Sequence, residues 1–250
     1  MLGLPRWFHR WASPPHVYEL AERWRPWLGG LALLTILGGA YGGLVLAPPD
    51  YLQGDSFRII YVHVPSAYLS LMGYTLMAVA AGIGFVWRIK LAHAVAVSIA
   101  PIGASFTFLA LVTGGIWGRP TWGTYWEWGD ARLMFELLLL FLYLGYMALR
   151  ASFEDRDKAD RVSAILAVVG VVNVPIIHYS VEWWSTLHQG PTIAKLDTPS
   201  ITFDMLAPLL VMIAGFTLCF AWLVLNRLQG EIVEREHDAR WLRRFAEAVR

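Results

Sequence analysis

The stretch LAHAVAVSIAPIGASFTFLALVTGGIWG, residues 91–118, contains no aspartate, glutamate, lysine or arginine. About 20 apolar residues are enough for an α-helix to cross the hydrocarbon core of a bilayer, so this stretch predicts a membrane-spanning helix. Five further stretches have the same character, and the fourth along the chain is the weakest because it holds Glu136: residues 27–46, 59–87, 133–149, 162–181 and 205–226. The sequence therefore predicts an all-α integral membrane protein with six transmembrane helices.

The composition supports this fold class and excludes several functions. Hydrophobic residues make up 57% of the 250-residue chain and charged residues 16%, whereas a soluble domain has about a quarter charged. A net charge of +1 argues against a nucleic-acid binder, which needs a concentrated basic patch. The only cysteine is Cys219, which excludes a disulfide framework, a CxxC zinc or redox site, and the C-x-x-C-H motif of a c-type cytochrome.

The basic residues predict the orientation of the helices. Of the 20 lysines and arginines, 16 fall in the N-terminal segment, the second and fourth connections and the C-terminal tail. Cytoplasmic segments carry such an excess, so we expect both termini in the cytoplasm and three connections outside, at 47–58, 117–132 and 182–204.

This orientation predicts three parts of the chain. They are a cytoplasmic N-terminal segment (residues 1–26), a six-helix membrane domain (27–226) and a cytoplasmic C-terminal tail (227–250). The first span is too long for the core of a signal peptide and is expected to be an uncleaved anchor. The charged tail is expected to be helical, and either docks on a partner or lies in solvent or on the membrane surface.

The third connection, between the third and fourth helices, is unusually rich in tryptophan. Its sequence WGRPTWGTYWEWGDAR (117–132) holds Trp117, Trp122, Trp126 and Trp128. An aromatic belt at the membrane surface is one explanation. Four indoles interleaved with glycines favour a folded platform that binds a large planar ligand or an apolar partner helix.

Two histidines lie on the same predicted outer face. His63 is in YVHVPSAY (61–68), and His188 is in WWSTLHQG (183–190). Imidazole is a common axial ligand of haem iron, so the pair is a candidate haem site. Either histidine could equally be structural, with its hydrogen bonds satisfied inside the protein.

Charged residues near the tryptophans have alternative roles. Asp130 precedes the fourth span and is expected to cap that helix. Arg132 and Glu136 are four residues apart, so they could form an ion pair on one helix face, although an intramembrane carboxylate is also a functional candidate. Four cations are predicted on the outer face, and one or two of them could bind haem propionates: Arg58, Arg119, Arg132 and Lys195.

On the motifs YVHVPSA, WGTYW followed by DARL, and WWSTLHQG, the sequence resembles the WWD-domain haem-handling family of cytochrome c biogenesis over nearly its whole length. The resemblance implies that a haem b is held non-covalently and transiently on the periplasmic side of the bacterial inner membrane. His63 and His188 would be its axial ligands. The other implied haem-binding residues are Trp117, Trp122, Trp126, Trp128, Asp130 and Arg132. The family pattern W-x-W-D is interrupted here by Gly129, which would rotate Asp130 relative to the indoles or be absorbed as a bulge.

The resemblance also implies a role and partners. Such proteins deliver haem to a membrane-anchored haem chaperone, beside the membrane and ATPase subunits of an ATP-binding cassette transporter and a small single-span subunit. The chain lacks the G-x-x-x-x-G-K-[S/T] motif, so any ATP use belongs to a partner. Haem transfer of this kind is sometimes described as lyase-like, but no residue here is expected to be catalytic.

Three alternatives differ in function class. A transporter or channel subunit that exports haem or another small molecule would hold its ligand inside the bundle, with a path to both faces. A haem-dependent electron carrier would need histidine pairs deep within the helices. A purely structural membrane subunit would leave the histidines and tryptophans unexplained.

Overall fold

The computed structural model describes residues 13–184, 186–188 and 201–242. Its helices, with a π-helical turn η1 and a 3-10 turn η2, are α2 (Pro14–Tyr41), η1 (Gly42–Leu46), η2 (Asp55–Ile59), α3 (Ile60–Trp87), α4 (Lys90–Trp122), α5 (Ala131–Ala151), α6 (Arg156–Gly170), α7 (Asn173–Trp183) and α8 (Phe203–Arg235). Six helical segments of this part of the chain are long and apolar enough to cross a membrane, with α6 and α7 forming one of them. The predicted all-α membrane fold is confirmed.

The helices extend beyond the apolar stretches that predicted them. α2 begins at Pro14, inside the predicted N-terminal segment, and α8 continues without a break to Arg235, inside the predicted tail. Charged residues such as glutamate and arginine end an apolar run but are good helix formers, so a helix can continue past the membrane border. The predicted boundaries of the membrane domain, at residues 26 and 226, concern where the chain leaves the membrane, and they stay a prediction.

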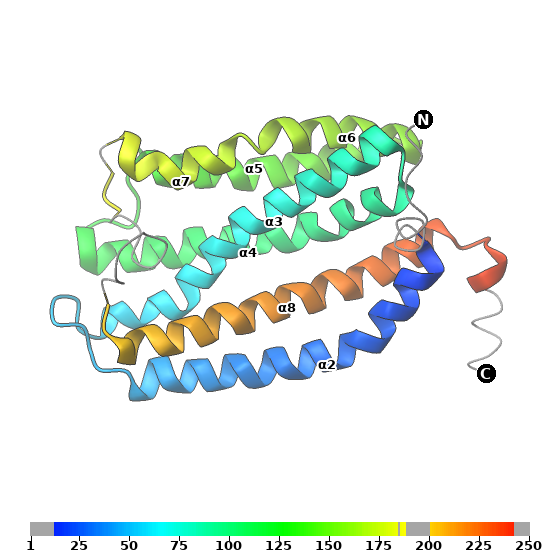
Figure 1. Cartoon of the computed structure of the whole chain (residues 1–250). Helices are drawn as coiled ribbons and strands as arrows, with labels where there is room; N and C mark the ends of the chain where they lie inside the picture. Colours follow the sequence, from blue (N-terminus) through cyan, green and yellow to red (C-terminus); the bar gives the residue numbers. More distant parts are fainter. Residues whose placement is uncertain (1–12, 185, 189–200, 243–250) are drawn as a thin grey trace.

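Two helices form the centre of the bundle. α3 packs along α4, the pair α2 and α8 covers one side, and α5 with α6 and α7 covers the other (Figure 1). The start of α2 and the end of α8 lie at the same end of the bundle, where the rings of Tyr18 and Trp241 are 5.8 Å apart. This arrangement agrees with an even number of spans.

The described part of the C-terminal tail packs on its own chain. Gln229 accepts a hydrogen bond from the Arg25 guanidinium at 3.1 Å, and Ile232 is buried beside Leu91. Trp241 lies against α2 through Tyr18. The tail up to residue 242 is therefore a packed element, and the residues beyond it lie outside the described part.

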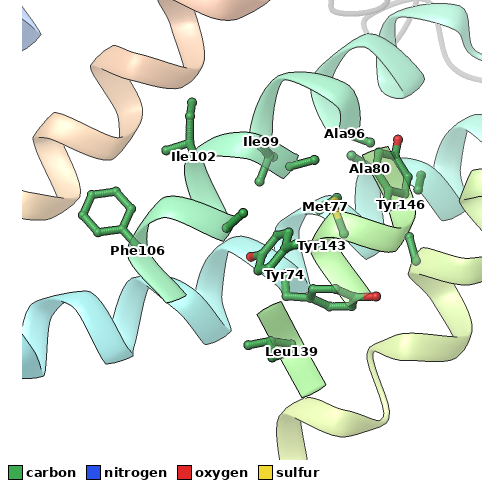
Figure 2. Close-up of a cluster of buried hydrophobic side chains, with 14 of the residues drawn as sticks. Tyr74, Met77, Ala80, Ala96, Ile99, Ile102, Phe106, Leu139, Tyr143 and Tyr146 are labelled. Atoms are coloured by element: carbon green, nitrogen blue, oxygen red, sulfur yellow. The ribbon is translucent and has the colours of Figure 1, made fainter. Parts of the chain in front are cut away.

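The core between α3, α4 and α5 is built on large aromatic side chains. Tyr74 and Tyr143 meet edge to face, with ring centroids 4.9 Å apart, beside buried Met77 and Leu139 (Figure 2). The Tyr143 hydroxyl donates a hydrogen bond to the carbonyl of Ser70 at 2.9 Å. This bond satisfies the polar end of a ring that lies at membrane depth.

Gly103 on α4 makes room for that tyrosine, and the fold predicts the effect of filling the space. A Cβ on Gly103 would overlap the ring and hydroxyl of Tyr143, so Gly103→Ala is expected to destabilise the protein by about 1–3 kcal/mol, as overpacking does. Thermal unfolding in detergent measures this. Gly38→Ala is the control, because a Cβ there meets nothing within 4 Å. Equal melting temperatures for the two variants would contradict the packing.

The fifth predicted span, 162–181, is interrupted. α6 ends at Gly170 and α7 begins at Asn173. The cause is Pro175, which has no N–H and whose ring excludes the carbonyl four residues before it. Asn173 donates a side-chain hydrogen bond to the carbonyl of Phe135 at 2.9 Å, which fixes the break against α5.

Candidate functional site

The predicted site residues lie together at one end of the bundle, called here the tryptophan end. His63 is in the first turn of α3, Trp117 and Trp122 are in the last turns of α4, and His188 follows α7. The prediction that all four tryptophans lie in a loop over 117–132 is wrong for these two. Pro120 does not end α4, so the connection to α5 is only residues 123–130.

His63 is oriented by the backbone of α4. Its Nδ1 lies 3.1 Å from the carbonyl oxygen of Ala110 and 3.0 Å from the hydroxyl oxygen of Thr113. The Thr113 hydroxyl itself donates to the carbonyl of Leu109 at 2.7 Å, so it can accept from the imidazole. A carbonyl oxygen only accepts, so Nδ1 carries the proton and Nε2 keeps its lone pair.

Asp130 connects His188 to the start of α5. The carboxylate accepts hydrogen bonds from the backbone N–H of Leu133 at 2.9 Å and of Leu187 at 2.7 Å. The first bond caps α5, as predicted. The second holds the segment that carries His188, whose Nδ1 lies 3.4 Å from Asp130 Oδ1. Asp130 thus positions the neighbouring histidine.

His63 has the environment typical of a metal-ligating imidazole, with one ring nitrogen bonded to a carbonyl oxygen. His188 Nδ1 lies 3.4 Å from the Asp130 carboxylate but has no hydrogen-bond partner among the described residues. For His188, burial lowers the pKa below its ordinary value of 6.5, Asp130 opposes this shift, and Arg132 adds to it. The neutral imidazole is the form that can bind a metal. The two rings are close enough to interact electrostatically.

The inserted Gly129 is accommodated in a turn. The backbone N–H of Asp130 donates to the carbonyl of Glu127 at 3.2 Å, and Gly129 N–H donates to the Glu127 side chain at 3.1 Å. Asp130 remains buried at the start of α5. The extra residue is therefore absorbed before the aspartate.

Two tryptophans lie at the edges of the two histidines. Trp117 is 5.6 Å from His63 between ring centroids, at an interplanar angle of 73°. Trp122 is 4.8 Å from His188, at 62°. The Trp117 indole is fixed by a hydrogen bond from its Nε1–H to the side-chain oxygen of Gln53 at 2.7 Å, a contact across 64 residues that no sequence pattern indicated.

The remaining two tryptophans differ in exposure. Trp126 and Trp128 meet at 66°, with centroids 5.6 Å apart. The two rings are therefore inclined to each other and do not lie in one plane. Trp126 Nε1 is buried and has no hydrogen-bond partner among the residues described. Trp128 is 73% exposed and available for contact with another molecule.

The predicted pairing of Arg132 with Glu136 is not formed within 4.0 Å. Glu136 instead accepts a hydrogen bond from the Ser70 hydroxyl at 2.6 Å, because α3 brings Ser70 to the buried carboxylate. Arg132 has no salt bridge or hydrogen bond in the part of the chain that the structure describes. It interacts electrostatically with Glu136, with Asp130 and with both imidazoles.

The other predicted outer cations are engaged or outside the described residues. Arg58 pairs with Asp55 at 2.9 Å and donates to the carbonyl of Gly43 at 2.7 Å. Arg119 donates to the carbonyl of Gly123 and lies over the Tyr125 ring. Lys195 is outside the described residues. Among the three described cations of this set, Arg132 is therefore the one left available to an anionic ligand.

Comparison with known proteins identifies the family. The sequence matches the family described as Heme exporter protein C over residues 7–243. A relative from Haemophilus influenzae is 47% identical over 98% of this chain and 99% of its own length, and one from Escherichia coli strain K12 is 50% identical over 94% of each. A relative from Bradyrhizobium diazoefficiens is 46% identical over 90% of this chain and 84% of its own length. All three are named Heme exporter protein C, and with matches of this identity and coverage the chain belongs to the heme exporter protein C family.

Proposed function

We propose that this chain binds haem at the tryptophan end and passes it on for haem export and cytochrome c maturation. One observation carries the proposal. Two imidazoles from separate elements lie near each other there. His63 Nδ1 is bonded to Ala110, which leaves its Nε2 for iron, and His188 Nδ1 lies 3.4 Å from the Asp130 carboxylate. The name shared by the relatives supports haem as the cargo.

His63 and His188 are the proposed axial ligands of a non-covalently bound haem b. Two imidazoles would fill both axial positions of the iron and limit its reaction with oxygen. Trp117 and Trp122 flank these ligands, and Trp126 and Trp128 add apolar contact area for the porphyrin. Arg132 would bind a propionate through charge-assisted hydrogen bonds.

The two ligands are held differently, which suits transient binding. His63 lies within a long helix, whereas His188 lies beyond the last turn of α7 and is tied to α5 through Asp130. Among the described residues, His188 lies outside a helix, and a non-helical segment opens more easily than a helix. Release of haem is therefore expected to begin at His188.

The proposed recipient is a membrane-anchored haem chaperone on the periplasmic side of the inner membrane. Exposed Trp128 lies beside the site and is a suitable contact for it. The further proposed partners are the membrane and ATPase subunits of an ATP-binding cassette exporter and a small single-span subunit. Both the orientation and these partners rest on the charge distribution and the family resemblance.

A transfer experiment tests the proposal. The full chain, loaded with haem in lipid nanodiscs, is mixed with the chaperone, and the haem on each protein is followed by absorbance after separation. Haem is expected to move to the chaperone at a rate that Trp128→Ala lowers. If the chaperone acquires haem equally fast from free haem, or the loaded chain never releases it, the delivery role is wrong.

The lowered pKa of His188 predicts the pH dependence of binding. Protonation removes the lone pair needed for ligation, so binding is present above the pKa of His188 and lost as the pH falls through it. Because burial places that pKa below 6.5, haem affinity is expected to stay constant from about pH 8 to 6.5 and to fall only below this range. Haem titrations at several pH values measure it. A loss of affinity that begins near pH 7 would contradict the described environment.

The second candidate function is an exporter subunit that moves haem or another small molecule through the membrane. The break between α6 and α7 favours it, because interrupted helices build binding sites within transporters. Vesicles containing the chain alone distinguish the two. Haem appearing on the far side of the vesicle membrane would favour export, and haem held at one face only would favour presentation.

A further inference from the structure

A cavity lies at the end of the bundle opposite the histidines. Its volume is about 350 Å³, and it is formed by α4, α5, the connection between α5 and α6, the start of α6, and α8. Val97, Pro101 and Met147 provide apolar walls. α4 packs against both α5 and α8. The cavity therefore lies where α4 meets α5 and α8.

The rim of the cavity is basic. Arg150, Arg156 and Arg227 line it, with Glu154 as the carboxylate among the lining residues. The guanidinium of Arg150 is already bound to Asp160 at 2.7 Å. The three arginines thus differ in how many donors they have left for a ligand.

Arg227 is the arginine with donors to spare. Arg156 pairs with Glu234, whereas Arg227 forms no salt bridge and no hydrogen bond within the described ranges of the chain. Arg227 is exposed on α8, next to residue 226, where the membrane domain is predicted to end. An anion at the rim would find this guanidinium unoccupied.

The apolar walls of the cavity lie at the depth in the membrane where lipid acyl chains are found. Val97 is seven residues from Lys90, where α4 begins, which is about 10 Å along a helix. Lys90 and Asp157 form an exposed ion pair at this end, with Lys90 Nζ 3.7 Å from Asp157 Oδ1, as suits charged side chains at the membrane surface. The walls therefore lie at the level of acyl chains, and the arginines lie at the level of phosphates.

We propose that this cavity binds an anionic phospholipid of the adjacent leaflet. Its phosphate would lie against Arg227 and Arg156, and one acyl chain would lie along Val97, Pro101 and Met147. Basic pockets between membrane helices bind anionic head groups in this way. A free phosphate ion would bind the arginines of the rim and leave the apolar walls uncovered. A basic rim together with apolar walls therefore fits a ligand that has both an anionic group and an apolar chain. The proposal is independent of haem binding.

Native mass spectrometry of the full chain tests it. Protein released from nanodiscs of mixed phosphatidylglycerol and phosphatidylcholine is expected to retain one phosphatidylglycerol. Arg227→Gln should lower the retained fraction about fivefold, the effect of removing one cation near an anionic lipid surface, and Arg227→Glu should lower it further. Because Arg227 is exposed and unpaired in the described structure, neither variant should alter the melting temperature.

Arg161→Gln is the matched control, since Arg161 is an exposed arginine at the same end that does not line the cavity. It should retain lipid like the unaltered chain. The proposal would be overturned if the chain retained both lipids equally, or if Arg161→Gln lost as much lipid as Arg227→Gln. Displacement of the lipid by inorganic phosphate at millimolar concentration would also overturn it. Exclusion of lipid by a co-purified protein over this cavity would overturn it as well.

Discussion

His63→Ala and His188→Ala are each expected to weaken haem binding by on the order of 100-fold or more and to convert a low-spin haem spectrum to a high-spin one. Loss of a partner that only orients a ligand costs about 10- to 100-fold in metal affinity, and removal of the ligand itself should cost at least as much. Optical titration of the full chain in nanodiscs measures both effects.

Two comparisons make this result specific. His237→Ala removes an exposed histidine beside Asp238 at the other end of the protein and should change nothing. Added imidazole should restore a low-spin spectrum to His63→Ala, since Ala110 and Thr113 remain to hold the added ring. If His63→Ala and His188→Ala both kept an unchanged haem spectrum, neither residue would be a ligand of the iron.

Asp130→Ala is expected to have two separable effects. Loss of the cap on α5 should cost about 1 kcal/mol of stability. Loss of the contacts to Leu187 and His188 should lower haem affinity about 10- to 100-fold. Thermal unfolding and haem titration measure the two effects on the same preparation.

Asp155→Ala provides the matched control for the cap. Asp155 caps α6 by accepting from the backbone N–H of Asp157 at 2.9 Å, and it lies at the end opposite the histidines. This variant should lose similar stability and bind haem normally. If Asp130→Ala lost stability but bound haem as tightly as Asp155→Ala, Asp130 would be a helix cap without a role in positioning His188.

The sequence predicted the features that depend on local chemistry. Apolar runs marked all six spans, five of them free of charge and the fourth interrupted only by Glu136, because the bilayer requires such runs whatever the helices pack against. Asp130 was expected to cap the fourth span from its position alone, and it does. The overall fold and the end of the bundle that carries the tryptophans were therefore predictable.

Features that depend on contacts between helices were not predictable. The acceptors of His63 are a carbonyl and a hydroxyl on another helix, and Trp117 is fixed by Gln53 from a distant connection. Arg132 and Glu136 interact electrostatically but do not form the expected ion pair within 4.0 Å, and Ser70 donates a hydrogen bond to the carboxylate from α3. Only the spacing of Thr113 and Trp117, four residues apart on one face of α4, could have linked those two residues to a common site.

The most direct test of the account is a titration of haem into the purified full chain in nanodiscs, read by optical and electron paramagnetic resonance spectra. The account predicts one haem per chain, with the low-spin spectrum of iron bound by two imidazoles. A chain that binds no haem, or binds it only with a high-spin spectrum, would contradict the proposed ligation by His63 and His188.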